Sequence, residues 1–447
     1  MWSPSDGPSG EERAEDRTPS QVLAGRAWVA GRLQPVEVAI SDDGRILSVG
    51  RIRGRAPRRD VGDWVILPAA TDLHVHFRDP GGDPGAETIP TGTVGAALGG
   101  VTLVGEMPNT RPPVLDVERL AEKEALVRGR AAVDVLLYAS ASEPKAFAGL
   151  ARRAGGFKLY LAPTTGIDQV PRGSALPPLF ESLAELPLPV SVHAEDPTRF
   201  RVNDLPHEPT EWNLDRPPDA EAAALDELEP APDRLRLHVA HVTTPTAVER
   251  LRARGRSFEA TPHHLLLSDR SGRDARFKVN PPLRSDADRA GLWAAFARGE
   301  VPMVASDHAP HTSDAKSLPF EKAPSGVPGV ETMVPLLLAK VRSGDLGLDV
   351  LLAAACDRPA RWFGQPLGRL LPGHRANLML VDFRARAPVT GRTLASPCGW
   401  SPFEGWEAIR PREVWRDGVP IVKDGEFVGR REGRVVRPDY AEAPRPR

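Results

Sequence analysis

Short apolar runs alternate with helical patterns through the middle of the chain, and this alternation limits the possible folds most. Stretches such as 116–129 and 244–255 carry apolar residues at helical spacing between the runs. Eight runs have the length and content of buried strands: residues 65–77, 102–107, 134–140, 156–161, 189–195, 236–242, 257–264 and 302–310. Eight successive strand-then-helix units predict an α/β fold, a parallel (β/α)₈ barrel of the TIM type.

Strand-like segments separated by glycine turns also lie at both ends of the chain. Neither end holds enough strands to bury a core of its own. We therefore predict a small β-sandwich domain built from both ends, residues 21–66 and 368–435, beside a barrel over residues 67–367. Residues 1–20 are polar and charged without an apolar core, which is typical of a disordered tail.

The composition excludes several classes of protein. A net charge of −2 over 447 residues argues against a general nucleic-acid or membrane-surface role. No apolar run approaches the roughly 18 residues that a membrane-spanning helix needs. The two cysteines, Cys356 and Cys398, are too few for a disulfide framework. We expect a soluble, cytoplasmic protein that acts on a small molecule, without nucleic-acid or membrane partners.

Polar side chains gather at the ends of the predicted strands. Residues of this kind close the first, fourth, fifth, sixth and eighth runs: His74, His76, Lys158, His193, His241 and Asp307. The carboxyl ends of the strands in such a barrel meet at one rim, which carries the active site. The sequence therefore predicts that these side chains converge.

Four imidazoles and a carboxylate at one rim predict a site for Zn²⁺ or a similar divalent ion. His74 and His76 occupy alternate positions of one strand and so face the same side. Asp307 could be a metal ligand, a base, or both. Metals acidify bound water, and a neighbouring carboxylate can pass the released proton to a leaving nitrogen. This combination predicts metal-assisted hydrolysis of an amide-like bond.

Lys158 has two interpretations that its position alone does not separate. A lysine near metal ligands can direct its amine to water. Alternatively, burial yields the neutral amine that reacts with CO₂, and the resulting carbamate can bridge two metal ions.

Three further residues suggest an anion site. Arg78 shares the strand face of His74 and His76, and arginine forms forked hydrogen bonds with carboxylates. Asn109 follows the neighbouring strand and could donate to the same anion, although a turn residue is an equally simple interpretation. His311, four residues after Asp307, could complete a carboxylate clamp.

Other histidines are predicted to support the fold. His238 and His241 are three residues apart on one strand, so we expect opposite orientations, with His241 in the barrel and His238 under a helix. His263 and His264 close the seventh run, where at most one of them reaches the pocket. His308 is expected to point away from the site.

An ordered series of motifs resembles the dihydroorotase family of the amidohydrolase superfamily, from about residue 65 to residue 406. The motifs are "DLHVHFRDPGG", "GGVTLVGEMPNTRPPV", "GFKLYL", "HAED", "LHVAHVTT", "TPHHLLLSD", "VNPPLR", "ASDHAPHT", "APSGVPGVET" and "SPFEGW". The resemblance implies reversible, metal-dependent hydrolysis of dihydroorotate to N-carbamoyl-L-aspartate in pyrimidine biosynthesis.

The resemblance also implies a role for each matching residue. Two Zn²⁺ ions per subunit would be held by His74, His76, Lys158 as its carbamate, His193, His241 and Asp307. Asp307 would also be the general acid and base. The substrate would contact His76, its carboxylate would bind Arg78, Asn109 and His311, and its ring would contact Asn280, Ser325 and Gly326. Residues 312–325 would form a mobile lid.

One motif departs from many bacterial members of the family, which carry an aspartate where this chain has "GFKLYL". Lys158 here resembles the version in the animal multifunctional pyrimidine protein, which favours a bridged two-metal centre. The resemblance also suggests a homodimer or a complex with aspartate transcarbamoylase.

Two rival functions remain at this stage. Hydantoinases, dihydropyrimidinases and allantoinases share the metal ligands, but an arginine-based carboxylate clamp does not suit dihydropyrimidines. A non-catalytic partner of aspartate transcarbamoylase would usually have lost ligands, and none is missing here.

Overall fold

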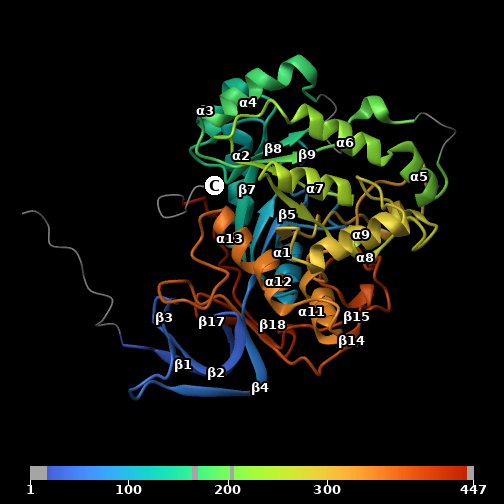
Figure 1. Cartoon of the computed structure of the whole chain (residues 1–447). Helices are drawn as coiled ribbons and strands as arrows, with labels where there is room; N and C mark the ends of the chain where they lie inside the picture. The colour runs from blue at the N-terminus through green and yellow to red at the C-terminus, as the bar shows by residue number, and fades with distance from the viewer. Residues whose placement is uncertain (1–17, 164–169, 202–205, 440–447) are drawn as a thin grey trace, which may run out of the picture.

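The computed structural model describes residues 18–163, 170–201 and 206–439, so residues 1–17 of the predicted tail lie outside the described part. Two eight-stranded sheets dominate the described chain. One curves into a barrel surrounded by helices, and the other lies below the barrel in Figure 1, where strands from both ends of the chain meet.

The barrel consists of parallel strands in sequential order. They are β5 (Ala70–Val75), β6 (Val101–Glu106), β7 (Asp134–Ser140), β8 (Gly156–Tyr160), β9 (Val190–His193), β10 (Leu237–Val239), β11 (Ser257–Ala260) and β12 (Met303–Val304). Nearly all of their residues are buried, because side chains fill the interior and helices cover the outside. Each predicted run overlaps one of these strands, so the predicted barrel is confirmed.

Contacts between β5 and the chain after β12 close the barrel. The backbone N–H of His76 donates to the carbonyl oxygen of His308 at 2.7 Å, and Val75 forms a parallel bridge with His308. The carboxylate of Asp72 accepts from the backbone N–H of Ser306 at 3.0 Å. The first and last units of the barrel are thereby fixed against each other.

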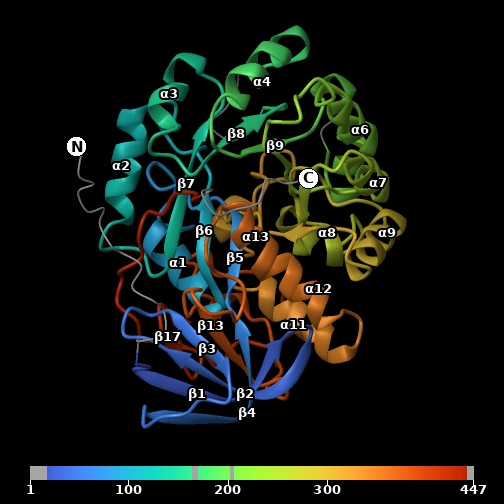
Figure 2. The same ribbon diagram turned by 60° about the vertical axis from the view of Figure 1, so that its left-hand side comes forward.

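Helices cover the outside of the barrel (Figure 2). They are α1 (Ile89–Leu98), α2 (Val117–Val127), α3 (Phe147–Leu150), α4 (Leu176–Ala184), α5 (Pro209–Asp215), α6 (Pro218–Glu227), α7 (Pro245–Ala253), α8 (Pro262–Leu266), α9 (Asp286–Ala297), α10 (Ser313–Lys316), α11 (Met333–Ser343), α12 (Leu348–Leu352) and α13 (Arg358–Trp362). Side-chain caps stabilise several helix starts. For example, the Thr244 hydroxyl accepts from the Ala247 N–H at the start of α7.

The second sheet joins the two ends of the chain, as the sequence predicts. Its strands are β1 (Gln21–Val29), β2 (Arg32–Ile40), β3 (Ile46–Gly50), β4 (Arg58–Pro68), β13 (Leu378–Val381), β16 (Glu413–Arg416), β17 (Val419–Lys423) and β18 (Glu426–Phe427). Strand β4 lies between β1 and β13 and pairs with both, so it links the N-terminal strands to the C-terminal ones. Apolar residues from both ends, among them Leu23, Ile66, Leu380 and Trp415, form a shared core.

Only Ala69 separates β4 from the first barrel strand, so the second sheet and the barrel are directly continuous. A further two-stranded sheet pairs β14 (Ala387–Pro388) with β15 (Glu407–Ala408). None of the helices in the described ranges is both long and apolar enough to cross a membrane.

Candidate active site

A cavity of about 50 Å³ opens at the carboxyl ends of the barrel strands. Its walls are formed by His74, His76, Arg78, Asn109, Lys158, Tyr160, His193, His241, Asn280, Asp307, Ala309, Ser325 and Gly326. Every residue singled out in the sequence for the site lines this cavity, except His311. The structure therefore brings together side chains that are up to about 250 residues apart in the chain.

The first group of candidate ligands contains His74, His76 and Asp307. The Nε2 atoms of the two histidines are 3.1 Å apart, and Asp307 Oδ1 lies 3.3 Å from His74 Nε2 and 3.2 Å from His76 Nε2. One ligand atom from each residue can be chosen so that all three lie within 4.8 Å of one another. This spacing allows the three atoms to contact one cation.

The second group contains His193 and His241, with Lys158 near both groups. His193 Nδ1 lies 3.0 Å from His241 Nε2, and Lys158 Nζ lies 3.3 Å from His74 Nε2. The positive charge of Lys158 contributes to the lowered pKa of both His74 and His193, after the larger effect of burial. Lys158 is therefore electrostatically coupled to both groups.

Burial fixes the protonation states of these side chains. It lowers the pKa of His74 and of His241 well below the usual value, so both imidazoles are neutral at pH 7. Burial also lowers the pKa of Lys158 to about 8, although the charges of Glu259 and Asp307 oppose this change. Burial alone would raise the pKa of Asp307, but the hydrogen bond and charge of His76 outweigh it and lower that pKa.

These residues fit a divalent metal ion by their chemistry. Neutral imidazoles and an ionised carboxylate are the protonation states in which these groups bind metals. Within the described ranges, the Nδ1 atom of His241 is buried without a hydrogen-bond partner, and such an unpaired polar atom is costly unless a ligand satisfies it.

Outer contacts hold the histidines in place. Glu259 accepts from His74 Nδ1 at 2.7 Å, and Glu195 pairs with His193 Nε2 at 2.8 Å. The Asn109 side-chain oxygen lies 2.5 Å from His76 Nδ1. Contacts of this kind fix the ring orientation and tautomer of a metal-binding histidine. Asn109, predicted as a substrate contact, therefore also positions His76.

His241 lines the cavity and His238 packs against a helix, as the sequence predicts, but their opposite orientation inferred from alternation is wrong. His238 does not lie on the opposite face from the site, because its Nε2 contacts the same Glu259 carboxylate that holds His74, at 3.0 Å. Strand β10 ends at Val239, and His241 beyond it has a positive φ of 38°, so alternation does not extend to it. His238 also packs against Trp362 of α13, with ring centroids 5.6 Å apart.

The seventh run is shorter than the sequence suggests. Strand β11 ends at Ala260, and Thr261 caps helix α8 by accepting from the His264 N–H. His263 and His264 therefore lie in the first turn of a helix rather than at the end of a strand. Neither of them lines the cavity.

Three cavity residues have a left-handed backbone. Among the described non-glycine residues, Arg78, His241 and Asp307 have φ values of 53°, 38° and 46°. Such conformations cost on the order of 1–3 kcal/mol each and persist where the surrounding structure holds them. All three follow a barrel strand, so the backbone turn directs each side chain toward the rim.

Arg78 is a half-buried cation at this cavity. Burial lowers its pKa to about 10, which keeps it charged at pH 7. Its Nη1 donates to the carbonyl oxygen of Pro310 at 2.7 Å, while its Nε–H is buried without an acceptor. In the described part of the chain, no carboxylate lies within 4 Å of its guanidinium. The guanidinium can therefore still receive an anion.

His311 does not line the cavity in this structure. Its Nε2 lies 3.0 Å from the backbone oxygen of Ser325, and its own carbonyl accepts from the indole of Trp400 at 2.8 Å. The imidazole is thus engaged by the backbone next to Gly326. At Gly326 φ is 132°, and an added Cβ would lie 2.3 Å from the Ala309 oxygen, so only glycine fits.

The segment 312–325, predicted as a lid, is fastened by Lys278. The Nζ of this lysine donates to the backbone oxygens of Phe320, Glu321 and Ala323 at 2.7, 3.3 and 3.0 Å. Its ammonium also lies 4.7 Å from the ring centre of Trp212. The opening of this segment as a lid stays a prediction.

Sequence reasoning missed Tyr160, Glu195 and Glu259. Tyr160 lines the cavity with a buried hydroxyl that has no hydrogen-bond partner among the residues the structure describes. Tyr160 and Glu195 each lie two residues after a predicted ligand, a spacing that could have indicated them. Glu259 is a lone acid within an apolar run, and only that unusual placement could have indicated its role at the site.

Comparison with protein families agrees with the geometry of the site. Residues 63–159 match the family described as Dihydro-orotase-like. A dihydroorotase of Halobacterium salinarum is 36% identical over 384 residues, which cover 84% of this chain and 90% of the relative. A dihydroorotase of Thermoplasma acidophilum is 33% identical over 406 residues, or 90% of this chain and 94% of the relative.

Solved structures show the same architecture at lower sequence identity. An L-hydantoinase (dihydropyrimidinase) from Arthrobacter aurescens has a TM-score of 0.86 and 24% identity, over 94% of this chain and all of the other. A dihydropyrimidinase from Brevibacillus agri NCHU1002 has a TM-score of 0.83 and 25% identity, over 94% of this chain and 98% of the other. At this level of identity, the two similarities show the fold alone.

Proposed function

Because the chain belongs to the dihydroorotase family, we propose that it hydrolyses the cyclic amide of (S)-dihydroorotate to N-carbamoyl-L-aspartate. The reaction is reversible and would serve pyrimidine (UMP) biosynthesis. The family relationship makes the chain a cyclic amide hydrolase, and the proposal concerns its substrate and the residues that act on it.

The environment of Arg78 is the main support for the proposed substrate. Among the described residues, its half-buried side chain has a buried Nε–H without an acceptor, at the cavity that also holds the candidate metal ligands. A buried donor without an acceptor costs about 1–3 kcal/mol, which a carboxylate on the substrate would recover. Dihydroorotate carries that carboxylate, whereas unsubstituted hydantoin and dihydropyrimidines do not.

The alternative is hydrolysis of an uncharged cyclic amide, as in hydantoinases, dihydropyrimidinases or allantoinases. Such a substrate would leave the Arg78 donor unsatisfied and would face a half-buried positive charge. A non-catalytic role as a partner of aspartate transcarbamoylase is disfavoured because no candidate ligand is missing from the cavity.

The proposed metal centre would hold two Zn²⁺ ions. Their ligands would be His74, His76, Lys158 as its carbamate, His193, His241 and Asp307. When bound, the metal supplies a water molecule of lowered pKa and polarises the substrate carbonyl. The pKa of Lys158, lowered by burial to about 8, supports the carbamate, because the neutral amine is the form that reacts with CO₂.

Asp307 is proposed to move the proton during the reaction. It is ionised at neutral pH, since contacts with His76 lower its pKa despite burial. The carboxylate would accept a proton from the attacking water and then donate it to the ring nitrogen as the C–N bond breaks. Its position beside His74 and His76 keeps this proton transfer at the metal-binding end of the cavity.

The other cavity residues are proposed to orient the substrate. Arg78 and the amide of Asn109 would hold its carboxylate, joined by His311 once that imidazole leaves the Ser325 carbonyl. The ring would contact Asn280, Ser325 and Gly326, with His76 nearby. Ser325 Oγ already donates to the Asn280 side-chain oxygen at 3.2 Å, so this wall is preorganised.

We also propose that the enzyme acts in the cytoplasm as a homodimer or in complex with aspartate transcarbamoylase, as its family resemblance implies. Light scattering of the purified chain, alone and with aspartate transcarbamoylase, tests the assembly. A single-chain mass under both conditions would contradict it.

Substrate discrimination provides the test of the proposed function. We expect hydrolysis of dihydroorotate, sensitive to chelators, to exceed that of hydantoin, dihydrouracil and allantoin. Arg78→Met should raise KM for dihydroorotate about 10- to 100-fold, since one charged hydrogen-bonded contact is lost. The control is Arg111→Met, an exposed arginine outside the cavity. Faster hydrolysis of an uncharged ring, or an unchanged KM in Arg78→Met, would refute the proposal.

A further inference from the structure

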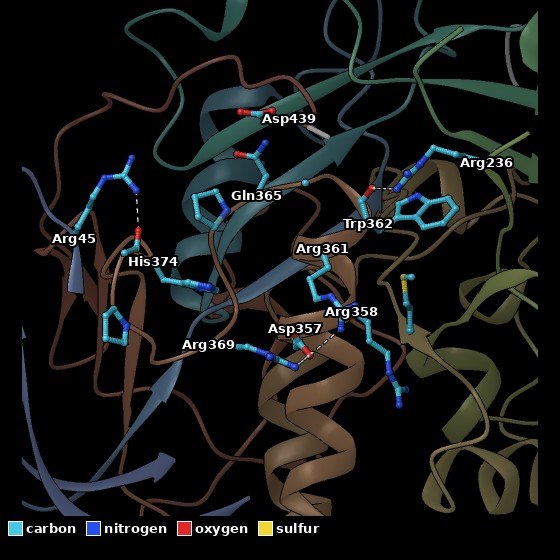
Figure 3. A pocket seen from close by; sticks show the side chains of 15 residues that line it. Arg45, Arg236, Asp357, Arg358, Arg361, Trp362, Gln365, Arg369, His374 and Asp439 are labelled. Carbon is cyan, nitrogen blue, oxygen red and sulfur yellow. Dashed lines mark hydrogen bonds and ion pairs between the residues drawn. The ribbon is translucent and has the colours of Figure 1, made fainter. Parts of the chain in front are cut away.

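A second and larger cavity, of about 840 Å³, lies at the other end of the barrel. Arg236 immediately precedes β10, and Met303 begins β12, so this cavity adjoins the amino ends of the strands. Figure 3 shows its lining side chains around a common hollow. Barrel, C-terminal helices and second sheet all contribute to its wall. We name it the arginine cavity after its five arginines: Arg45, Arg236, Arg358, Arg361 and Arg369.

The charges around the arginine cavity are unbalanced. Its five arginines face two carboxylates in the wall, Asp357 and Asp439, and Asp43 lies 3.8 Å from Arg45, which leaves an excess of two positive charges. Asp357 accepts from Arg369 at 2.8 Å and lies 3.9 Å from Arg361, so one acid serves two guanidinium groups.

Two other arginines of the cavity donate to backbone oxygens. Arg358 donates to that of Pro302 at 3.0 Å, and Arg45 donates to that of Gly373 at 2.8 Å while also lying 3.8 Å from Asp43. In the part of the chain that the structure describes, no carboxylate lies within 4 Å of Arg358. The backbone oxygen of Pro302 satisfies the Arg358 donor but does not neutralise its charge, so the cavity remains electropositive.

The cavity is accessible and of a size that suits a metabolite. Ligand pockets typically enclose roughly 300–1,000 Å³. The side chains of Arg45, Arg361 and Arg369 are 44%, 54% and 49% exposed, so their donors are open to an incoming molecule. Guanidinium groups match phosphate oxygens with paired hydrogen bonds and hold them more specifically than an ammonium does.

We propose that the arginine cavity binds a small polyanion that carries phosphate groups, up to the size of a nucleoside triphosphate. The excess of positive charge requires several negative charges on the ligand, and phosphate groups supply them in a small volume. The site lies at the end of the barrel opposite to the catalytic cavity and shares no lining residue with it. The ligand therefore binds without competing with the substrate.

Calorimetric titration of the metal-loaded enzyme with inorganic pyrophosphate tests this proposal, with metal content measured before and after. We expect one pyrophosphate per chain, retained in saturating dihydroorotate. Arg358→Ala and Arg361→Ala should each weaken binding about tenfold or more, the loss expected for a charge-assisted contact. The control is Arg298→Ala, an exposed arginine that pairs with Glu300 outside the cavity.

Several outcomes would overturn the proposal. They are a dissociation constant above about 1 mM, unchanged affinity in both cavity variants, or displacement of pyrophosphate by dihydroorotate. Citrate, titrated at equal ionic strength, separates phosphate from carboxylate recognition, and equal affinity for citrate would refute the phosphate assignment. Unchanged melting temperatures of the variants exclude a loss of fold as the cause of weaker binding.

Discussion

Glu259 provides the sharpest test of how the barrel interior supports the metal site. Its carboxylate is buried and receives hydrogen bonds from His74 Nδ1 at 2.7 Å and His238 Nε2 at 3.0 Å. His238 Nδ1 in turn lies 2.8 Å from the hydroxyl of Ser257. The charge of Glu259 thus acts on His74 through one hydrogen bond, and we expect it to strengthen metal binding by that histidine.

Glu259→Gln separates this charge from the hydrogen bonds. The glutamine oxygen can still accept from His74, and its amide can donate to His238 Nε2 once the His238 proton moves to Nδ1. Ser257 can accept at that atom, so the network stays satisfied. We therefore expect a small loss of stability, about 1 kcal/mol, but a 10- to 100-fold loss of metal affinity, or about 1.4–2.7 kcal/mol.

Glu259→Ala should act differently because it leaves two buried imidazole nitrogens, His74 Nδ1 and His238 Nε2, without a partner. At about 1–3 kcal/mol for each group, the expected loss of folding stability is about 2–6 kcal/mol. This variant measures the structural role of the carboxylate, whereas Glu259→Gln measures its effect on the metal.

Chelator competition without substrate measures the metal dissociation constant directly. The matched control is Glu124→Gln, a buried carboxylate on α2 that pairs with Arg153 outside the barrel. The control should bind metal like the wild type. Wild-type affinity in Glu259→Gln, or an equal loss in the control, would show that the carboxylate does not position His74 for metal.

Three further predictions concern other parts of the molecule. Asp307→Asn should lower kcat by at least about 10²-fold, the typical contribution of a general acid or base, while the melting temperature stays unchanged; near wild-type turnover would contradict the proposed proton transfer. Lys278→Met removes the donor to three backbone oxygens of segment 312–325, so hydrogen exchange there should rise about tenfold or more, and unchanged exchange would show that other contacts hold the segment. Burial raises the pKa of Glu331 to about 7 despite the charge of Arg410; a raised pKa stabilises the fold below the unfolded value and loses that effect as pH rises through 7. The melting temperature of Glu331→Gln relative to wild type should therefore increase from pH 5 to pH 8, and a constant or falling difference would refute this assignment.

The barrel and most of the cavity wall could be predicted because they depend on local patterns. Alternating strands and helices predict the barrel, and the carboxyl ends of parallel strands must meet at one rim. Residues as distant in the chain as His74 and Asp307 could therefore be placed together from their positions after strands. The same logic located Lys158 and His193.

Side-chain orientations predicted from alternation fail where the chain leaves a strand, because alternation holds only while the backbone stays extended. His241 lies past the end of β10 with a positive φ, so its relation to His238 could not be derived from their spacing. The start of α8 at Pro262 similarly moved His263 from a strand end to a helix. His311 lies outside regular secondary structure, and its side chain contacts the Ser325 carbonyl, which its spacing from Asp307 could not predict.

The sequence by itself determined which residue types stand after each strand, and with them the chemistry available at the rim. Only the tertiary structure decided that Glu259 joins His74 to His238, that Lys278 fastens a segment more than 40 residues away, and that arginines from four regions surround one cavity. The physical reason is that these contacts depend on packing between elements distant in the chain, and no local pattern of residues encodes such distances.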